Sequence, residues 1–422
     1  SDLLYKPQEL RKNMLGFLAE QGLSEIAATA FSTPRRLTLF ITGLPEKSDD
    51  FIEERKGPRV DAPQKALDGF LRSVDLELDQ LTVKRDGNVD KYFASIKTPG
   101  RISTQIIAEA LEKTIRTFPW PKSMRWGVSS LRWVRPLKGI LCIFIKDADH
   151  QVIDLQIDGI RSDSCTTGHR FMAPEYFTVK DFEDYKLKLR NAFVILDNRE
   201  RSEIILNDAN NLAFANGLDL INDDTLLEEV SGLVEWPVTL LGKVDKAFLD
   251  LPSEVLRASM KEHQKFFSLK NPKTEKIERF ITVANIESAD NGATILEGNQ
   301  KVLYARLSDA KFFWENDLRL IQKDGLDTWL EKLKNVTFHN KLGSQADKVL
   351  RISALTKKLV GPLACDGEAA INAADICKSD LASEMVYEFP ELQGVMGRYY
   401  AISCGYSDSV AKVCEEHYKP KG

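Results

Sequence analysis

Two short apolar runs in the middle of the chain place the tightest constraint on its fold. Residues 238–241 and 280–284 are rich in β-branched side chains, which is typical of buried strands. Between them, Ser253 follows Pro252 and is expected to cap a helix that runs through Met260. Strands and a helix within one stretch predict an α+β module over residues 226–317.

The sequence after Trp314 changes to helical spacing. Ser344 and Asp347 form a capping-box pattern, and Gly361-Pro362 is expected to end the helix that they begin. This spacing predicts an all-α domain that begins near residues 305–320. The helices expected in it cover residues 319–334, 344–360, 368–388 and 408–417.

The first half of the chain mixes both kinds of element. A polar loop is expected over residues 53–63, because Gly57, Pro58 and Pro63 interrupt regular structure. Residues 140–145 are expected to form a strand that is buried on both faces. The other elements predicted here are a strand over 37–41 and helices over 9–22, 101–117 and, in two parts, 181–216 before Gly217.

Length and composition describe a globular protein without a general affinity for polyanions. A chain of 422 residues predicts two or three domains, and its net charge of −5 excludes an overall basic surface. The six cysteines form no C-x-x-C pair, which argues against a zinc site or a disulfide framework and fits a reducing compartment. No apolar run is long enough to cross a membrane, so a cytoplasmic protein is expected.

Local basic groups are therefore the candidates for nucleic-acid binding. Around residues 120–135, tryptophans alternate with cations, and such sequences can stack bases while holding phosphates. Alternatively, the tryptophans enter the core and the cations are solvated or pair with neighbours such as Glu53 and Glu54. The candidate residues in this first third are Arg35, Arg36, Arg55, Lys56, Arg59, Lys122 and Arg125.

Two histidine-containing segments add further candidates. His169 and Arg170 lie in a short polar turn, where the imidazole could contact RNA, act as an acid or base, or simply hold the turn by hydrogen bonds. His263 and Lys265 follow the helix expected in the central stretch. Catalytic signatures are absent: the sequence contains no phosphate-binding glycine loop, no H-E-x-x-H and no G-x-S-x-G.

A set of motifs spread in order along the chain resembles one family, the β subunit of the bacterial two-subunit glycyl-tRNA synthetase. The motifs are Thr33-Pro34-Arg35-Arg36-Leu37, Arg55-Lys56-Gly57-Pro58, Pro121 to Gly127, Trp133-Val134-Arg135-Pro136, Gly168-His169-Arg170-Phe171-Met172, Leu233 to Val238, Lys261 to Phe267 and Glu388 to Gly397. The resemblance implies a subunit of a glycine–tRNA ligase that binds tRNA(Gly) and joins an α subunit in an α2β2 heterotetramer. It implies that ATP is used by the whole enzyme at a site in the α subunit, with no catalytic residue, metal or cofactor in this chain. Membrane and DNA are not expected partners.

The resemblance also implies a domain order within the α+β class. An amino-terminal α+β domain over residues 1–165 would precede a central domain over 166–315 and an all-α domain over 316–422. The α+β region is similar to the B3/B4 editing-type fold of phenylalanyl-tRNA synthetase β, here expected to serve as a scaffold because a glycine pocket already excludes larger amino acids by size. Family members have a motif that is missing around Leu4–Tyr5 and continue past Tyr418 into an anticodon-binding domain, so a fragment is expected.

The all-α part resembles a degenerate HD-type domain that begins at Phe338-His339, which opens a second hypothesis. This would be a metal-dependent phosphohydrolase with an RNA-binding appendage. Lys378-Ser379-Asp380 stands where a metal-binding His-Asp pair is required, and an ammonium group has no lone pair for a metal. We therefore expect no metal site. A third hypothesis is an RNA-binding scaffold that acts without an α partner.

Overall fold

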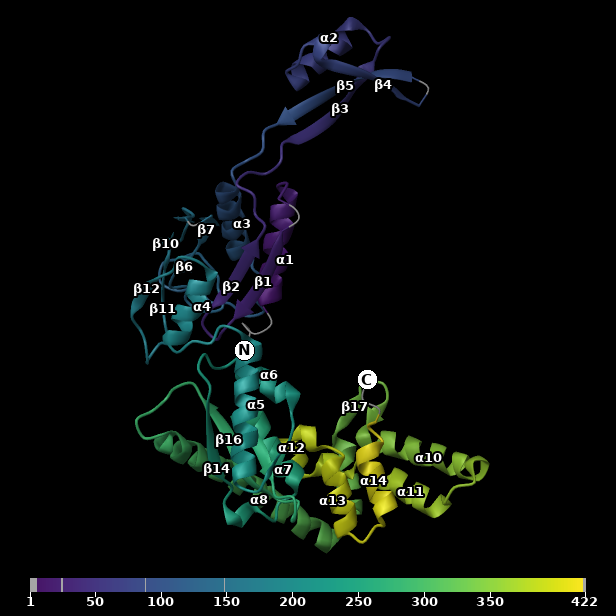
Figure 1. Ribbon diagram of the computed structural model, residues 1–422. Helices are drawn as coiled ribbons and strands as arrows, with labels where there is room; N and C mark the ends of the chain where they lie inside the picture. The colour runs from purple at the N-terminus through teal and green to yellow at the C-terminus, as the bar shows by residue number, and fades with distance from the viewer. Residues whose placement is uncertain (1–5, 24–25, 88, 148, 420–422) are drawn as a thin grey trace. The chain divides into compact units, whose positions relative to one another are not determined.

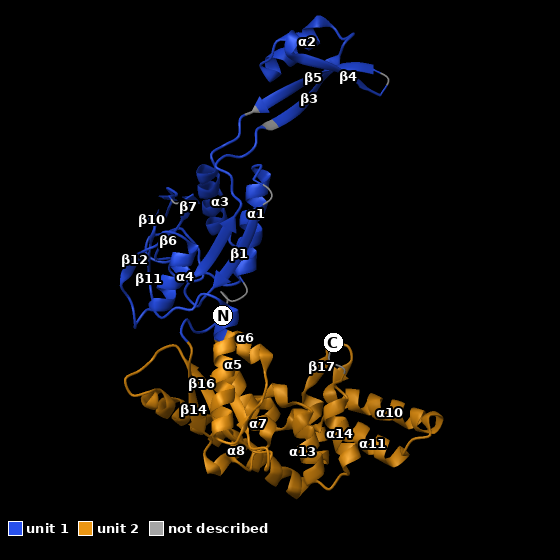
Figure 2. Ribbon diagram, in the orientation of Figure 1, with its two compact units in different colours: residues 1–201, 231–236 blue, residues 202–230, 237–422 orange. Residues whose placement is uncertain are grey.

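The computed structural model describes residues 6–23, 26–87, 89–147 and 149–419 (Figure 1). The chain divides into two compact units, unit 1 with residues 1–201 and 231–236 and unit 2 with residues 202–230 and 237–422 (Figure 2). Helices and strands occur in both units, which confirms the α+β class. The three-domain division stays a prediction, and the expectation for Leu4–Tyr5 lies outside the described residues.

Unit 1 is built from antiparallel hairpins and small sheets with helices beside them. The sheets are ordered β1-β2, β3-β5-β4, β6-β10-β9, β7-β8 and β11-β12, and β6 pairs with β10 in parallel. Its helices are α1 (Pro7–Glu20), α2 (Gln64–Val74), α3 (Ser103–Thr117) and α4 (Phe182–Asn191), and α5 (Asn198–Ala215) begins in it. Its strands are β1 (Ala27–Ser32), β2 (Leu37–Thr42), β3 (Phe51–Arg59), β4 (Leu81–Asp86), β5 (Val89–Thr98), β6 (Ile140–Leu141), β7 (Ile143–Lys146), β8 (Asp149–Val152), β9 (Gln156–Ile157), β10 (Ile160–Asp163), β11 (Cys165–Thr167) and β12 (Tyr176–Thr178).

Helical spacing explains how α1 and α3 meet in the core of unit 1. Leu10, Met14 and Leu18 recur every four residues on α1 and are buried in one cluster with Ile106 of α3. Trp133 is buried in the same cluster. The predicted helices over 9–22 and 101–117 are thus confirmed with shifted ends, and the tryptophans around residues 120–135 pack into or against the core.

Two predictions for unit 1 are wrong. The stretch expected to be a polar loop, residues 53–63, largely forms strand β3, because β5 supplies backbone partners along its length. The stretch expected to be one buried strand, residues 140–145, breaks at Cys142: β6 pairs with β10, whereas β7 pairs with β8. Ile145 is consequently 40% exposed rather than buried on both faces.

Unit 2 joins a four-stranded sheet to a helical region. The sheet has the order β13-β15-β16-β14, formed by β13 (Asp219–Leu220), β14 (Val238–Lys243), β15 (Phe267–Lys270) and β16 (Ile277–Ala284). The two apolar runs that constrain the fold pair with each other, with Leu241 opposite Ile281, so these predicted strands are confirmed. The predicted cap is wrong, because Pro252 takes the capping position and Ser253 is the first helical residue.

The helices of unit 2 surround a second core centred on Trp329 and Tyr400. Ser344 and Asp347 form the predicted capping box, but α10 (Gln345–Leu363) continues through Pro362 instead of ending before it. A hairpin of β17 (Thr337–His339) and β18 (Gly343–Ser344) interrupts the expected all-α region. The helices are α6 (Asp224–Ser231), α7 (Ser253–Ala258) with a π-helical turn over Ser259–His263, α8 (Ala293–Asp324), α9 (Asp327–Lys332), α10 (Gln345–Leu363), α11 (Gly367–Ile376), α12 (Glu384–Glu388), α13 (Val395–Ser403) and α14 (Asp408–Glu416).

Asp380 ties the start of α13 to the rest of this core. Its buried carboxylate accepts hydrogen bonds from the backbone N–H groups of Gly394 and Gly397. A Cβ at position 397 would lie 3.0 Å from Cys414 Cβ and 3.2 Å from Asp380 Cγ, so a larger residue there would need its neighbours to shift by a few tenths of an ångström. Burial raises the pKa of Asp380 to about 6, although the two N–H donors and Lys378 favour its charged form.

This raised pKa predicts a pH-dependent stability. In the unfolded chain the ordinary pKa is 3.8, so between about pH 4 and pH 6 the folded state binds a proton that the unfolded state has released. Stability therefore falls as pH rises through this window, by about 3 kcal/mol in total. Asp380→Asn should flatten the free energy of unfolding against pH over this range. An unchanged slope in the variant, measured by denaturant titration at each pH, would contradict this role.

Candidate nucleic-acid interface

A buried carboxylate organises one region of unit 1. Glu235 is fully buried, and its Oε1 accepts hydrogen bonds from Thr33 Oγ1 at 2.6 Å and from Arg36 Nη1. The other terminal nitrogen of Arg36 donates to the carbonyl oxygens of Thr167 and Gly168. One guanidinium group thus joins three segments that are more than sixty residues apart in sequence.

These contacts bring together motifs that the sequence showed only separately. Thr33 to Leu37, Gly168 to Met172 and Leu233 to Val238 meet at the Arg36–Glu235 pair. Arg135, from the motif Trp133 to Pro136, lies within electrostatic reach of Arg35. Four of the recognised motifs therefore contribute to one site.

The outward side of this site carries the arginine cluster, which we define as Arg35, Arg135 and Arg170. All three are exposed, and none forms an ion pair within the part of the chain that the structure describes. The pKa of Arg35 is lowered, chiefly by partial burial and further by Arg170, Arg36 and Arg135, while Glu235 opposes this shift. A bound anion would offset the repulsion that Arg35 experiences from these neighbouring cations.

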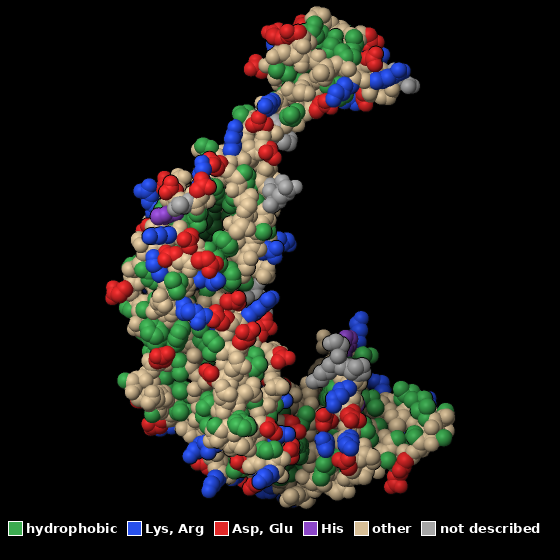
Figure 3. Space-filling model, in the orientation of Figure 1, with side chains coloured by type: hydrophobic (Ala, Val, Ile, Leu, Met, Phe, Trp, Pro, Cys, Tyr) green, Lys and Arg blue, Asp and Glu red, His purple; other side chains and the backbone are tan. Residues whose placement is uncertain are grey.

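An exposed aromatic ring borders the arginine cluster. Phe171 is 67% exposed, and the guanidinium carbon of Arg170 lies 5.1 Å from the centre of its ring. A guanidinium group beside an open aromatic face can hold a phosphate while the ring stacks on a base. In the space-filling view, basic and acidic side chains are interspersed over the visible face (Figure 3).

His169 shapes the turn that presents Arg170 and Phe171. Its ring is fully buried, and Nδ1 accepts hydrogen bonds from the N–H groups of Phe171 and Met172, both at 3.3 Å. A Cβ at Gly168 would lie 2.4 Å from Ala192 Cβ, so glycine is required for the close approach of the two segments. Among the roles left open for His169, the structure supports the hydrogen-bonding one.

Arg201 is a structural residue that the sequence analysis missed. Its buried guanidinium donates to the carbonyl oxygens of Ser32, Ile195, Leu196 and Ser231 and to the side chain of Asn198. Burial lowers its pKa to about 10, and Glu235 and Asp197 oppose this shift. No signal in the sequence marked it, because an arginine near the start of a helix is usually solvated.

The candidates on strand β3 already have local partners. Arg55 pairs with Glu53 at 2.9 Å, Lys56 pairs with Asp86, and Arg59 pairs with Asp61 at 2.9 Å. For Arg55 this is the local pairing that the sequence left open as an alternative. These cations remain half exposed, and each has a carboxylate in ion-pair contact.

The remaining candidates lie on other elements. Lys122 and Arg125 are exposed in the segment between α3 and β6. In unit 2, His263 is exposed on the π-helical turn, and Lys265 pairs with Glu229 at 3.1 Å. Of the predicted RNA-binding residues, the structure thus groups Arg35, Arg36, His169 and Arg170 and leaves the others apart.

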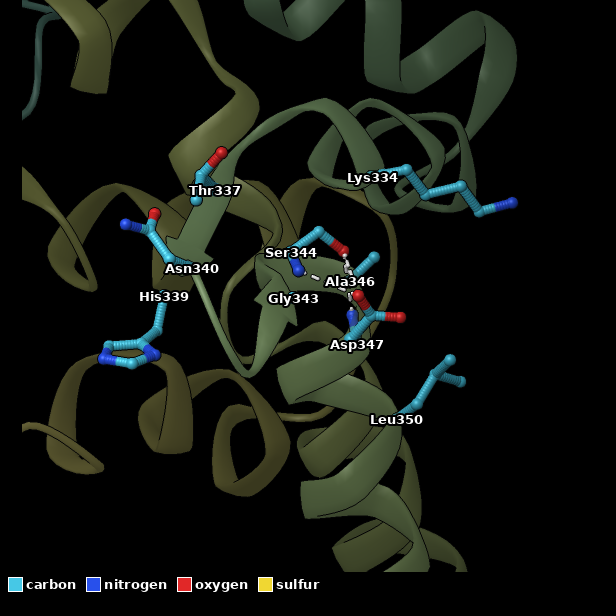
Figure 4. A pocket seen from close by; sticks show the side chains of 9 residues that line it. All are labelled: Lys334, Thr337, His339, Asn340, Gly343, Ser344, Ala346, Asp347 and Leu350. Carbon is cyan, nitrogen blue, oxygen red and sulfur yellow. Dashed lines mark hydrogen bonds between the residues drawn. The ribbon is translucent and has the colours of Figure 1, made fainter.

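The residues that prompted the phosphohydrolase hypothesis have structural contacts. Lys378 Nζ lies 2.8 Å from His417 Nε2 and over the ring of Tyr418, while Asp380 holds α13. His339 lines an open hollow beside the β17–β18 hairpin, where Figure 4 shows Ser344 and Asp347 joined by the capping-box hydrogen bonds. Among the described residues, no three His, Cys, Asp or Glu side chains are grouped to hold a metal, and no helix is long and apolar enough to span a membrane.

Comparisons with known proteins give one consistent family. The family described as "Glycyl-tRNA synthetase beta subunit" matches residues 3–422. A protein of Ruegeria sp. named "Glycine--tRNA ligase beta subunit" is 58% identical over 98% of this chain and 61% of its own length. Proteins of the same name from Dinoroseobacter shibae and Phenylobacterium zucineum are 55% and 50% identical over 98% and 96% of this chain and 58% and 60% of their own lengths. The chain thus spans about three fifths of these relatives.

Replacing Arg35 and replacing Arg36 should have different effects on the free energy of unfolding. Arg36→Ala leaves Glu235 buried without its main partner, and we expect it to lower the free energy of unfolding by about 3–5 kcal/mol. Arg35→Ala removes an exposed side chain and should change stability by no more than about 0.5 kcal/mol. Denaturant unfolding of both variants tests this, and equal effects would contradict the inward and outward assignment.

Proposed function

The chain belongs to the family of glycyl-tRNA synthetase β subunits, and from this we propose that it acts in a glycine–tRNA ligase by binding tRNA(Gly) through the arginine cluster. The observation that carries the proposal is the group of unpaired guanidiniums beside the exposed ring of Phe171. Phosphates along an RNA backbone neutralise such cations, and a splayed base stacks on such a ring.

The contacts beneath the cluster support this role, because recognition depends on fixed geometry. Arg36, which pairs with the buried Glu235, also donates to the carbonyl oxygen of Gly168, and Thr33 Oγ1 accepts a hydrogen bond from the backbone N–H of Arg35. His169 holds the following turn from within. Arg35 and Arg170 are therefore presented from an ordered backbone, which lowers the entropic cost of binding a phosphate.

We further propose a division of labour with a partner α subunit. The α subunit would carry ATP-dependent glycine activation and transfer, and this chain would bind no ATP, metal or other cofactor. The α+β region would serve as an editing-type scaffold, and the helical part of unit 2 as an HD-type domain with a structural role. The structural contacts of Lys378 and Asp380 support this assignment.

Replacing the arginine cluster tests the proposal. In the complete α–β assembly, Arg35→Ala, Arg135→Ala and Arg170→Ala together should weaken tRNA(Gly) binding and lower the slope of log affinity against log salt by about 0.7–0.9 for each lost phosphate contact. The matched control removes three arginines that already pair with carboxylates, Arg116, Arg161 and Arg190. This control loses the same net charge and should keep both affinity and slope.

Filter binding or fluorescence titration over a range of salt concentrations measures both quantities. If both triple variants lose the same amount of tRNA affinity, the loss is explained by the change in net charge and not by the arginine cluster. Unchanged affinity in a folded Arg35/Arg135/Arg170 variant would remove the cluster from the RNA-binding surface.

A further inference from the structure

Helix α10 in unit 2 exposes a row of leucines to solvent. The leucine stripe, which we define as Leu355, Leu359 and Leu363, has side chains that are 58%, 44% and 67% exposed. Residues four apart lie on one side of a helix, so the three form a continuous line. The buried face of the same helix is made by others, including Val349 and Ser353. Figure 3 shows hydrophobic side chains gathered over the end of α10.

Unpaired cations run beside the leucine stripe. Arg351 and Lys358 are two helical turns apart and share one side of α10. Neither forms an ion pair among the residues that the structure describes. The nearest acid on the helix, Asp347, uses its carboxylate in the capping box with Ser344 and attracts Arg351 only at longer range. In a chain with a net charge of −5, α10 is thus a locally basic and apolar surface.

We propose that the leucine stripe is the docking site for an amphipathic helix of the partner subunit, whose acidic side chains face Arg351 and Lys358. This inference rests on the proposed function, which supplies the partner subunit. Apolar side chains on the incoming helix would cover the three leucines, and its carboxylates would satisfy the two cations.

Charge and side-chain type select this occupant over others. A second copy of the chain would bring Arg351 and Lys358 against the same cations, which opposes association. RNA would find phosphate partners there but no ring to stack on, because leucine has no aromatic face. An acidic amphipathic helix matches both properties of the surface.

Two double variants of the complete β subunit test the proposal. Leu355→Asp with Leu359→Asp should weaken assembly with the partner subunit on the order of tenfold or more, as should Arg351→Glu with Lys358→Glu. The charge variant should also invert the salt dependence of assembly, because screening would then relieve repulsion between like charges. The control, Leu78→Asp with Leu187→Asp, changes two exposed leucines of unit 1 and should assemble like the wild type. Sedimentation gives the affinity, and thermal unfolding confirms that the variants fold.

The outcomes separate this inference from the function on which it rests. If the wild type does not assemble with the partner subunit, the proposed function fails. If the wild type assembles and both stripe variants assemble equally well, only the docking site is overturned. Self-association or binding to anionic vesicles that the stripe variants abolish, with normal assembly, would assign the stripe to a second copy or to a lipid surface and overturn the proposal.

Discussion

The site in unit 1 depends on one buried carboxylate, that of Glu235. A carboxylate in the protein interior is costly unless an opposite charge and hydrogen bonds compensate it, and here Arg36 and Thr33 supply both. The same guanidinium also binds the carbonyl oxygens of Thr167 and Gly168. The arginine that compensates the charge of Glu235 therefore also joins the segments that contain these residues. Arg201 adds a second buried guanidinium that satisfies carbonyl oxygens of Ser32 and Ser231 in the same region. Structure and proposed function are thus coupled, since the inward arginine fixes the backbone that presents the outward ones.

The sequence predicted elements whose cause is local. Residues 238–241 and 280–284 are apolar enough to be buried as strands. The start of α10 is set by the capping box, whose two side chains, Ser344 and Asp347, belong to one stretch of four residues. Predictions from the sequence were wrong where an element depends on a partner that is distant in the chain. Residues 51–59 form a strand because β5 lies some forty residues further on, and their charges and punctuating residues gave no sign of that pairing. The break at Cys142 likewise depends on β8 and β10, which compete for neighbouring halves of one apolar run.

For the site, sequence motifs named the right segments but not their geometry. Arg35 and Arg36 read alike as exposed cations at a strand end, yet one points to solvent and its neighbour binds a buried acid. Arg135 was visible within a motif, but its proximity to Arg35 depends on a fold that brings residues a hundred positions apart together. Conversely, the cations on β3 fitted an RNA-binding loop in the sequence, whereas the structure pairs them with Glu53, Asp61 and Asp86. Charge type was predictable from sequence, whereas the sequence left open which of these cations are paired with a carboxylate.

If the proposed function is right, the face of unit 1 beside Phe171 touches RNA. A photoreactive benzoylphenylalanine in place of Phe171, in the complete α–β assembly bound to tRNA(Gly), tests this directly. The same label at Phe214, which is 87% exposed in unit 2, is the control for chance contact. We expect a crosslink to the tRNA from position 171 and none from position 214. An assembly that binds tRNA(Gly) with normal affinity and gives no crosslink from position 171 would contradict it.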